Sequence, residues 1–158
     1  MKKMCKKCWG IVSILALILI AGAYKFIISG DTTVSPDERI AIQLTEPERN
    51  LVLTEMRTFL STIQQISSGL ASEDFELIAE QSRLSGLSAQ QAVPGSLMGK
   101  LPIEFKKLGF DTHKKFDALA LDAEQLEDKE HTLNQMSKLM TNCIACHAAY
   151  KIETINSK

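Results

Sequence analysis

The sequence predicts an all-α protein: an antiparallel four-helix bundle preceded by one transmembrane helix. After residue 45, apolar residues recur at steps of three and four, the spacing that places them on one face of a helix. Helix start signals precede these runs, and Gly or Pro residues separate them. Near the N-terminus, an apolar run of about twenty residues matches the thickness of a bilayer's hydrocarbon core.

The N-terminal segment predicts a membrane anchor over residues 9–30, after a short tail over residues 1–8 that holds four lysines. Because these lysines precede the run and none closely follows Lys25, we expect the tail to be cytoplasmic and the rest of the chain to lie outside. A cleaved signal peptide is the alternative, since Ala21-Gly22-Ala23 fits a small-x-small cleavage site. We favour a retained anchor, because the apolar run continues to Ile28. Cys5 and Cys8 form a lone C-x-x-C, for which we predict no role.

The 128 residues from Asp31 onward have the size of one domain. They carry thirteen Lys and Arg against nineteen Asp and Glu, a net charge of −6. An acidic domain without a basic stripe argues against nucleic acid as a partner, and it leaves electrostatic docking to another protein open.

Residues 31–44 read as a linker, and residues 45–158 as the helical domain. Thr45 and Glu48 form a Thr-x-x-Glu capping box at the start of the first long helix, which is expected to end at Gly69–Ser72. Further helices are predicted over 73–84, from Pro102 with an interruption at Gly109, and from about 128 to 153; residues 88–101 read as a long loop. The expected apolar face of the first helix is Leu53, Met56, Leu60, Ile63 and Leu70, and that of the last is Leu133, Met136, Met140, Cys143, His147 and Tyr150.

Residues 143–147 spell C-x-x-C-H, the attachment motif of a c-type haem. Residues three apart share one face of a helix, so Cys143 and Cys146 can each form a thioether to the same porphyrin. His147 then offers an imidazole nitrogen to the iron as its proximal ligand. A zinc site usually needs a second cysteine pair, and a thioredoxin-like redox pair needs a βαβ context that this region does not suggest. We therefore predict one covalent haem c with its iron as the cofactor.

With the motif on the last of four predicted helices, the chain resembles the cytochrome c′ family. The ending C-x-x-C-H-x-x-aromatic-basic is similar to residues 143–151, although that family usually has arginine where this chain has Lys151. The resemblance implies a haem inside a four-helix bundle, with Tyr150 near it. It also implies that the first helix provides what faces the iron: an apolar side chain in members that bind gases, or a methionine in members that transfer electrons.

Met56 is the one methionine of the first helix, and by this resemblance and its spacing it is the expected sixth iron ligand. Met136 and His131 lie roughly 16 and 24 Å from His147 along the same helix, too far to reach the distal face. Met98 and His113 remain as other candidates; we expect His113 to be exposed because two lysines follow it. The alternative for Met56 is core packing, with Leu53 or Leu60 covering the distal face.

These features predict a cytochrome in the bacterial inner membrane with its haem domain in the periplasm, carrying out one-electron transfer to or from a redox partner protein. The first alternative is a five-coordinate protein that binds nitric oxide or carbon monoxide; the second is an assembly subunit that the haem stabilises. Without a recognisable acid/base pair or nucleophile set, we do not expect an enzyme. The family resemblance makes a homodimer plausible.

Overall fold

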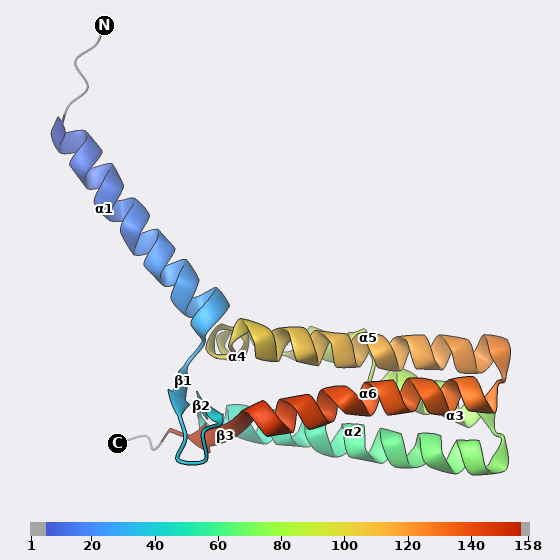
Figure 1. The fold of residues 1–158 in the computed structure, drawn as a ribbon. Helices are drawn as coiled ribbons and strands as arrows, with labels where there is room; N and C mark the ends of the chain where they lie inside the picture. Colours follow the sequence, from blue (N-terminus) through green and yellow to red (C-terminus); the bar gives the residue numbers. More distant parts are fainter. Residues whose placement is uncertain (1–5, 156–158) are drawn as a thin grey trace, which may run out of the picture.

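The computed structural model describes residues 6–155, which form six α-helices, a π-helix, a short 3₁₀ helix and three β-strands (Figure 1). The structure is mostly helical, as predicted. Residues 1–5, including Cys5, and residues 156–158 lie outside this description.

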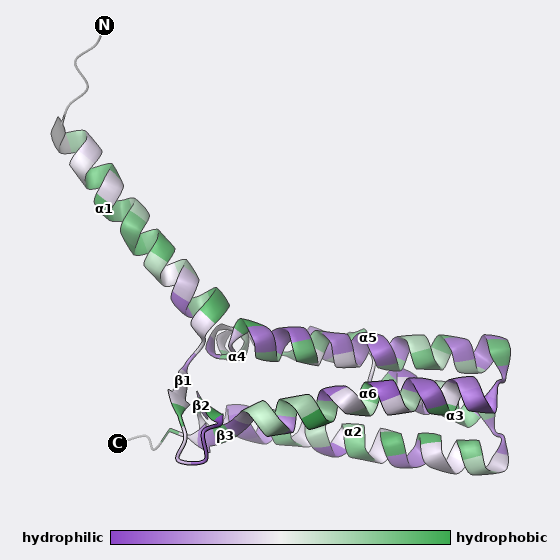
Figure 2. Cartoon of the chain, viewed as in Figure 1, coloured by the Kyte–Doolittle hydropathy of each residue, from purple (hydrophilic) through white to green (hydrophobic). Residues whose placement is uncertain are grey.

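The N-terminal helix α1 (Lys6–Ala23) continues into the π-helix η1 (Tyr24–Ser29) and projects away from the rest of the molecule (Figure 1). Hydrophobic residues recur along most of its length (Figure 2). Residues Cys8–Ser29 are long and apolar enough to cross a membrane, with a mean hydropathy of 2.5, and none of that span is buried in the structure. A signal sequence would have the same length and apolar composition. We call this span the membrane-directed segment, a term that covers both a retained anchor and a signal sequence.

The segment predicted as a linker, residues 31–44, instead forms two strands, β1 (Thr32–Val34) and β2 (Ile40–Leu44). They pair antiparallel, and β2 also pairs in parallel with β3 (Tyr150–Thr154), with Ile40 opposite Tyr150. The linker prediction was wrong because the partner strand lies more than a hundred residues away in the sequence. The same pairing ends the last helix at Ala149 rather than near residue 153.

The first long helix, α2 (Glu46–Ser72), starts and ends where the sequence predicted. The Thr45 backbone N–H and hydroxyl both donate to Glu48 Oε2, at 2.9 and 2.8 Å, and the capping box is complete. The same carboxylate pairs with Lys100 Nζ at 2.5 Å. Glu48 thus ties the start of α2 to the segment around residue 100.

The remaining helices are α3 (Phe75–Leu84), α4 (Gly95–Lys100), α5 (Ile103–Leu126) and α6 (Lys129–Ala149). The stretch predicted as a long loop contains the 3₁₀ helix η2 (Leu87–Ala92) and α4. Gly109 does not interrupt α5, because a single glycine inside a helix costs only about 1 kcal/mol and neighbouring packing compensates for it.

Helices α2, α3, α5 and α6 pack around a core at the end far from the sheet. A second, smaller buried cluster lies at the sheet end and joins β2, α4 and Tyr150. Most of the buried residues of α2 lie one position before a residue of the predicted face. Val52, Phe59 and Ile66 are buried, whereas Leu60 of the predicted face is 72% exposed. The predicted apolar face of α2 is therefore only partly used for helix packing. The core residues at the far end are Phe59, Ile66, Leu70, Ile78, Ala79, Phe116, Leu119, Ala123 and Leu139.

Hydrogen bonds from two residues, Asp31 and Lys106, hold the junction between η1 and the helical domain. The Asp31 N–H donates to the Lys100 carbonyl at 2.7 Å, and Lys106 Nζ donates to the Phe26 and Ile27 carbonyls at 3.2 and 3.3 Å. Gly30 has a φ of +66° and lies directly against the Lys100 carbonyl, so a side chain there would be both strained and without space. The membrane-directed segment therefore meets the domain at α4 and the start of α5.

Candidate cofactor site

Cys143, Cys146 and His147 lie in the last turns of α6, just before β3, and all three line one cavity of about 440 Å³. This volume falls within the range of small-molecule and cofactor sites. The walls are mainly apolar and come from α2, α5 and α6. They include Leu53, Met56, Phe59, Leu60, Ile63, Phe105, Leu108, Thr112, His113, Met140 and Asn142.

Both thiols are free, partly buried and uncharged at neutral pH. Burial raises the pKa of Cys143, and burial together with Cys143 raises the pKa of Cys146 to about 11. A redox-active cysteine pair usually has the opposite shift, a thiol pKa lowered by its surroundings. Among residues 6–155, moreover, the structure brings together no group of three or more His, Cys, Asp or Glu side chains that could hold a metal ion by themselves. The raised thiol pKa values thus disfavour the thioredoxin-like alternative.

His147 has an exposed side chain that borders the main cavity and a smaller neighbouring cavity of about 260 Å³. Its backbone carbonyl accepts a hydrogen bond from Arg39 Nη1 at 3.4 Å, which links the end of α6 to the turn before β2. Arg39, Arg49 and Lys151 line the smaller cavity; Arg39 is paired with Asp37 and Lys151 with Glu153.

Met56 lies between the two cavities, as it lines both and packs against both buried clusters. Cys143 packs against the first of these clusters and Cys146 against the second. Met56, on α2, thus shares one cluster with each cysteine of the motif. Leu53 also lines both cavities, and Leu60 lines the main cavity at its exposed edge. The structure therefore gathers Met56, Leu53 and Leu60 around the motif.

Tyr150, predicted to lie in the same pocket, borders only the smaller cavity. It is 9% exposed, and its ring packs edge-on against Phe105 with 5.3 Å between ring centroids. Because Phe105 borders both cavities, Tyr150 supports the wall of the main cavity from behind.

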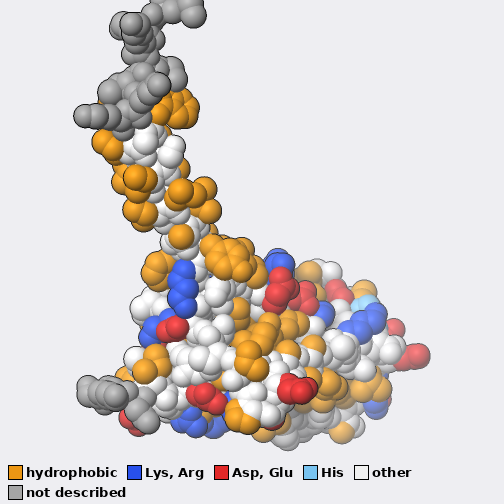
Figure 3. All heavy atoms as spheres, turned by 60° about the vertical axis from the view of Figure 1, so that its left-hand side comes forward, with side chains coloured by type: hydrophobic (Ala, Val, Ile, Leu, Met, Phe, Trp, Pro, Cys, Tyr) orange, Lys and Arg blue, Asp and Glu red, His pale blue; other side chains and the backbone are white. Residues whose placement is uncertain are grey.

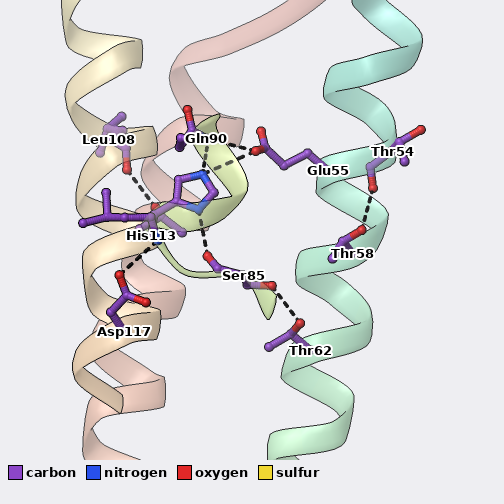
Figure 4. Close-up of polar contacts among 11 residues, drawn as sticks. Thr54, Glu55, Thr58, Thr62, Ser85, Gln90, Leu108, His113 and Asp117 are labelled. Atoms are coloured by element: carbon purple, nitrogen blue, oxygen red, sulfur yellow. Dashed lines mark hydrogen bonds and ion pairs between the residues drawn. The ribbon is translucent and has the colours of Figure 1, made fainter. Parts of the chain in front are cut away.

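The prediction that His113 is exposed was wrong: it is 1% exposed and lines the main cavity. Its Nδ1 lies 2.7 Å from the Ser85 carbonyl oxygen, and its Nε2 contacts the Gln90 amide and lies 3.4 Å from Glu55 Oε1 (Figure 4). The ring also packs edge-on against Phe59 at 5.0 Å. The following lysines suggested exposure, but His113 falls three residues before the buried Phe116, and that spacing was the better signal.

The environment of His113 also changes its ionisation. Burial acts to lower the pKa of the imidazole, but the hydrogen bonds to the Glu55 carboxylate and the Ser85 carbonyl outweigh it, so that the pKa is raised. Gln90 Nε2 donates to Glu55 Oε1 at 2.9 Å and completes the network. Both ring nitrogens are thus occupied by protein groups.

The other histidine and methionine candidates occupy different places in the structure. His131 is a surface residue, as predicted, with Nε2 2.9 Å from Asp122 Oδ2. Met136 packs against the far core, and Met140 lines the main cavity from α6. Met98 lines a separate cleft and takes no part in the lining of the main cavity.

Comparisons of the chain with protein-family models, curated proteins and solved structures found no match.

Proposed function

We propose that this protein is a membrane-anchored cytochrome whose four-helix bundle holds one covalent haem c and carries out one-electron transfer. The main observation in support of this proposal is that Cys143, Cys146 and His147 line a single apolar cavity together with Met56. Cys143 and Cys146 would hold the haem through thioethers, and His147 would be the proximal iron ligand. Met56 would be the sixth ligand, and a methionine opposite histidine raises the reduction potential.

The cavity walls fit a flat, mostly apolar ring. Leu60 is 72% exposed and Met140 is 41% exposed at the cavity, and apolar side chains lose contact with water when they cover such a ring. The neutral, partly buried thiols lie on the face of α6 that the ring would cover. Arg49, in the smaller cavity beside His147, is of the residue type that pairs with the carboxylates that haem carries.

The location proposed is the bacterial inner membrane, with α1 as a single-pass anchor and the haem domain in the periplasm, where haem c is attached. The support is the apolar span Cys8–Ser29 with lysines on its N-terminal side. Such an anchor would keep the haem close to membrane-bound electron donors or acceptors.

The test is to express the full chain with haem c maturation and record oxidised and reduced optical spectra of the wild type, Met56→Ala and Met140→Ala. Met140 is the matched control because it lines the same cavity from α6. We expect a low-spin spectrum with a sulfur-to-iron charge-transfer band that Met56→Ala loses and Met140→Ala keeps. A high-spin spectrum unchanged by Met56→Ala, with ready carbon monoxide binding, would instead favour a gas-binding protein. Absence of covalent haem would refute the proposal.

A further inference from the structure

A second cleft, of about 310 Å³, lies on the other side of the contact between α2 and α5. Its walls come from α2, η2, α4 and α5, and it shares Glu55, Phe59, Phe105 and Gly109 with the candidate cofactor cavity. One layer of side chains therefore separates the two spaces.

The cleft lies beside the membrane-directed segment. Lys106 is part of its wall, and the same side chain donates to the Phe26 and Ile27 carbonyls at the end of η1. The Gly99 backbone, next to the lining residue Met98, lies against the Phe26 ring. Hydrophobic side chains continue from the base of the anchor onto the adjoining end of the domain (Figure 3). A molecule dissolved in the membrane would thus meet the cleft close to the lipid surface.

The cleft combines an apolar wall with a polar one. Leu97, Leu101 and Phe110 line it from α4, the residue after α4, and α5. Glu55 and Gln90 line it from α2 and η2, where Gln90 Nε2 donates to Glu55 Oε1 (Figure 4). The Gln90 amide nitrogen already contacts both Glu55 and His113, so the remaining amide and carboxylate oxygens offer acceptors to a ligand with hydroxyl groups.

We propose that this cleft binds the ring of a membrane quinol, an inference that rests on the proposed haem function. A quinol has a flat apolar ring with two hydroxyls, and its tail dissolves in the bilayer, so it matches the apolar wall, the polar wall and the position beside η1. When one electron leaves the quinol for an oxidised haem, one phenolic O–H bond breaks and its proton passes to water at the open cleft. The product is a neutral semiquinone. A second oxidised haem takes its remaining electron, the second phenolic O–H bond breaks with its proton passing to water, and the quinone forms.

The experiment uses the full chain in lipid nanodiscs, with a short-tailed naphthoquinone and its quinol as probes. Ala92→Phe places a large side chain in the wall of the cleft, whereas Gln91→Phe places the same side chain on the exposed neighbouring position outside it. Calorimetry measures quinone binding, and the haem spectrum measures reduction by the quinol and, separately, by dithionite.

We expect Ala92→Phe to weaken quinone binding and slow quinol reduction by tenfold or more, with Gln91→Phe like the wild type and dithionite equally fast on all three. Equal binding and equal quinol reduction in all three chains would overturn the proposal, as would binding of no quinone. If no haem is attached, the proposed function fails, but calorimetry still decides the cleft: binding lost only in Ala92→Phe supports it, and equal binding refutes it.

Discussion

The two ends of the helical domain are built from the same helices but are packed differently. At the end far from the sheet, Ile66, Phe116, Leu119 and Leu139 have no exposed surface, and the core is closed. Toward the sheet, the predicted apolar face of α2 borders cavities and stays partly exposed, as Leu60 shows. Since protein interiors normally pack densely, an open apolar cavity beside a C-x-x-C-H motif supports the proposal that these side chains serve a bound group rather than helix contacts.

The largest expected effect concerns the open end. The double change Cys143→Ser and Cys146→Ser removes both sulfur atoms that would form thioethers, so we expect covalent haem to be lost completely. The mass of the denatured protein measures this directly. Cys8→Ser is the control, because that exposed thiol lies in α1, and it should leave the attached haem unchanged. Haem retained in the double variant would show that the attachment is elsewhere.

A substitution at the closed end should lower the stability of the fold and leave haem attachment unchanged. Phe116 is fully buried and packs against Phe59 with 5.3 Å between ring centroids. Phe116→Ala should lower the free energy of unfolding by about 3–5 kcal/mol, because it leaves a cavity in a dense core. Denaturant unfolding followed by circular dichroism measures the change, and the fraction of chains with covalent haem should stay the same. A loss below about 1 kcal/mol would mean that the far core is not close-packed.

The difference between the ends also explains what the sequence could predict. Local signals located the capping box of Thr45 and Glu48 and the end of α2, because both depend on neighbouring residues. The motif at residues 143–147 also lies on the last helix, as its spacing predicted. The sheet could not be foreseen, since β2 pairs with a strand more than a hundred residues away. His113 was misjudged because the two lysines after it weighed more in the prediction than its spacing from Phe116.

Glu48 offers a smaller and pH-dependent test at the boundary of the open end. Burial acts to raise the pKa of this carboxyl, but hydrogen bonds from Lys100 and Thr45 outweigh it and lower the pKa below its ordinary value of 4.5. Its contribution to stability is therefore present above that ordinary value and is lost as the pH falls through the lowered one.

We accordingly expect Glu48→Gln to destabilise the protein by about 1–2 kcal/mol at neutral pH and to have little effect once the wild-type carboxyl is protonated. Denaturant unfolding at several pH values measures the difference between the two chains. Glu76→Gln, in the first turn of α3, is a control that lacks the Lys100 pair. A difference independent of pH would contradict the ionic origin of the effect.

The smallest effect should come from Leu60→Ala in the chain without haem, because a side chain that is 72% exposed loses little buried surface when it is shortened. We expect a change of about 0.5 kcal/mol or less in the Cys143→Ser and Cys146→Ser background. With haem attached, Leu60 covers the ring, and the same substitution should cost more. Ile78→Ala, in the closed core on α3 and outside the lining of the main cavity, should cost the same with and without haem, because distant sites add independently. Denaturant unfolding of the wild type, Leu60→Ala and the same two chains in the double-cysteine background measures the coupling between Leu60 and the haem. An equal cost of Leu60→Ala in both backgrounds would place the ring away from the α2 face of the cavity.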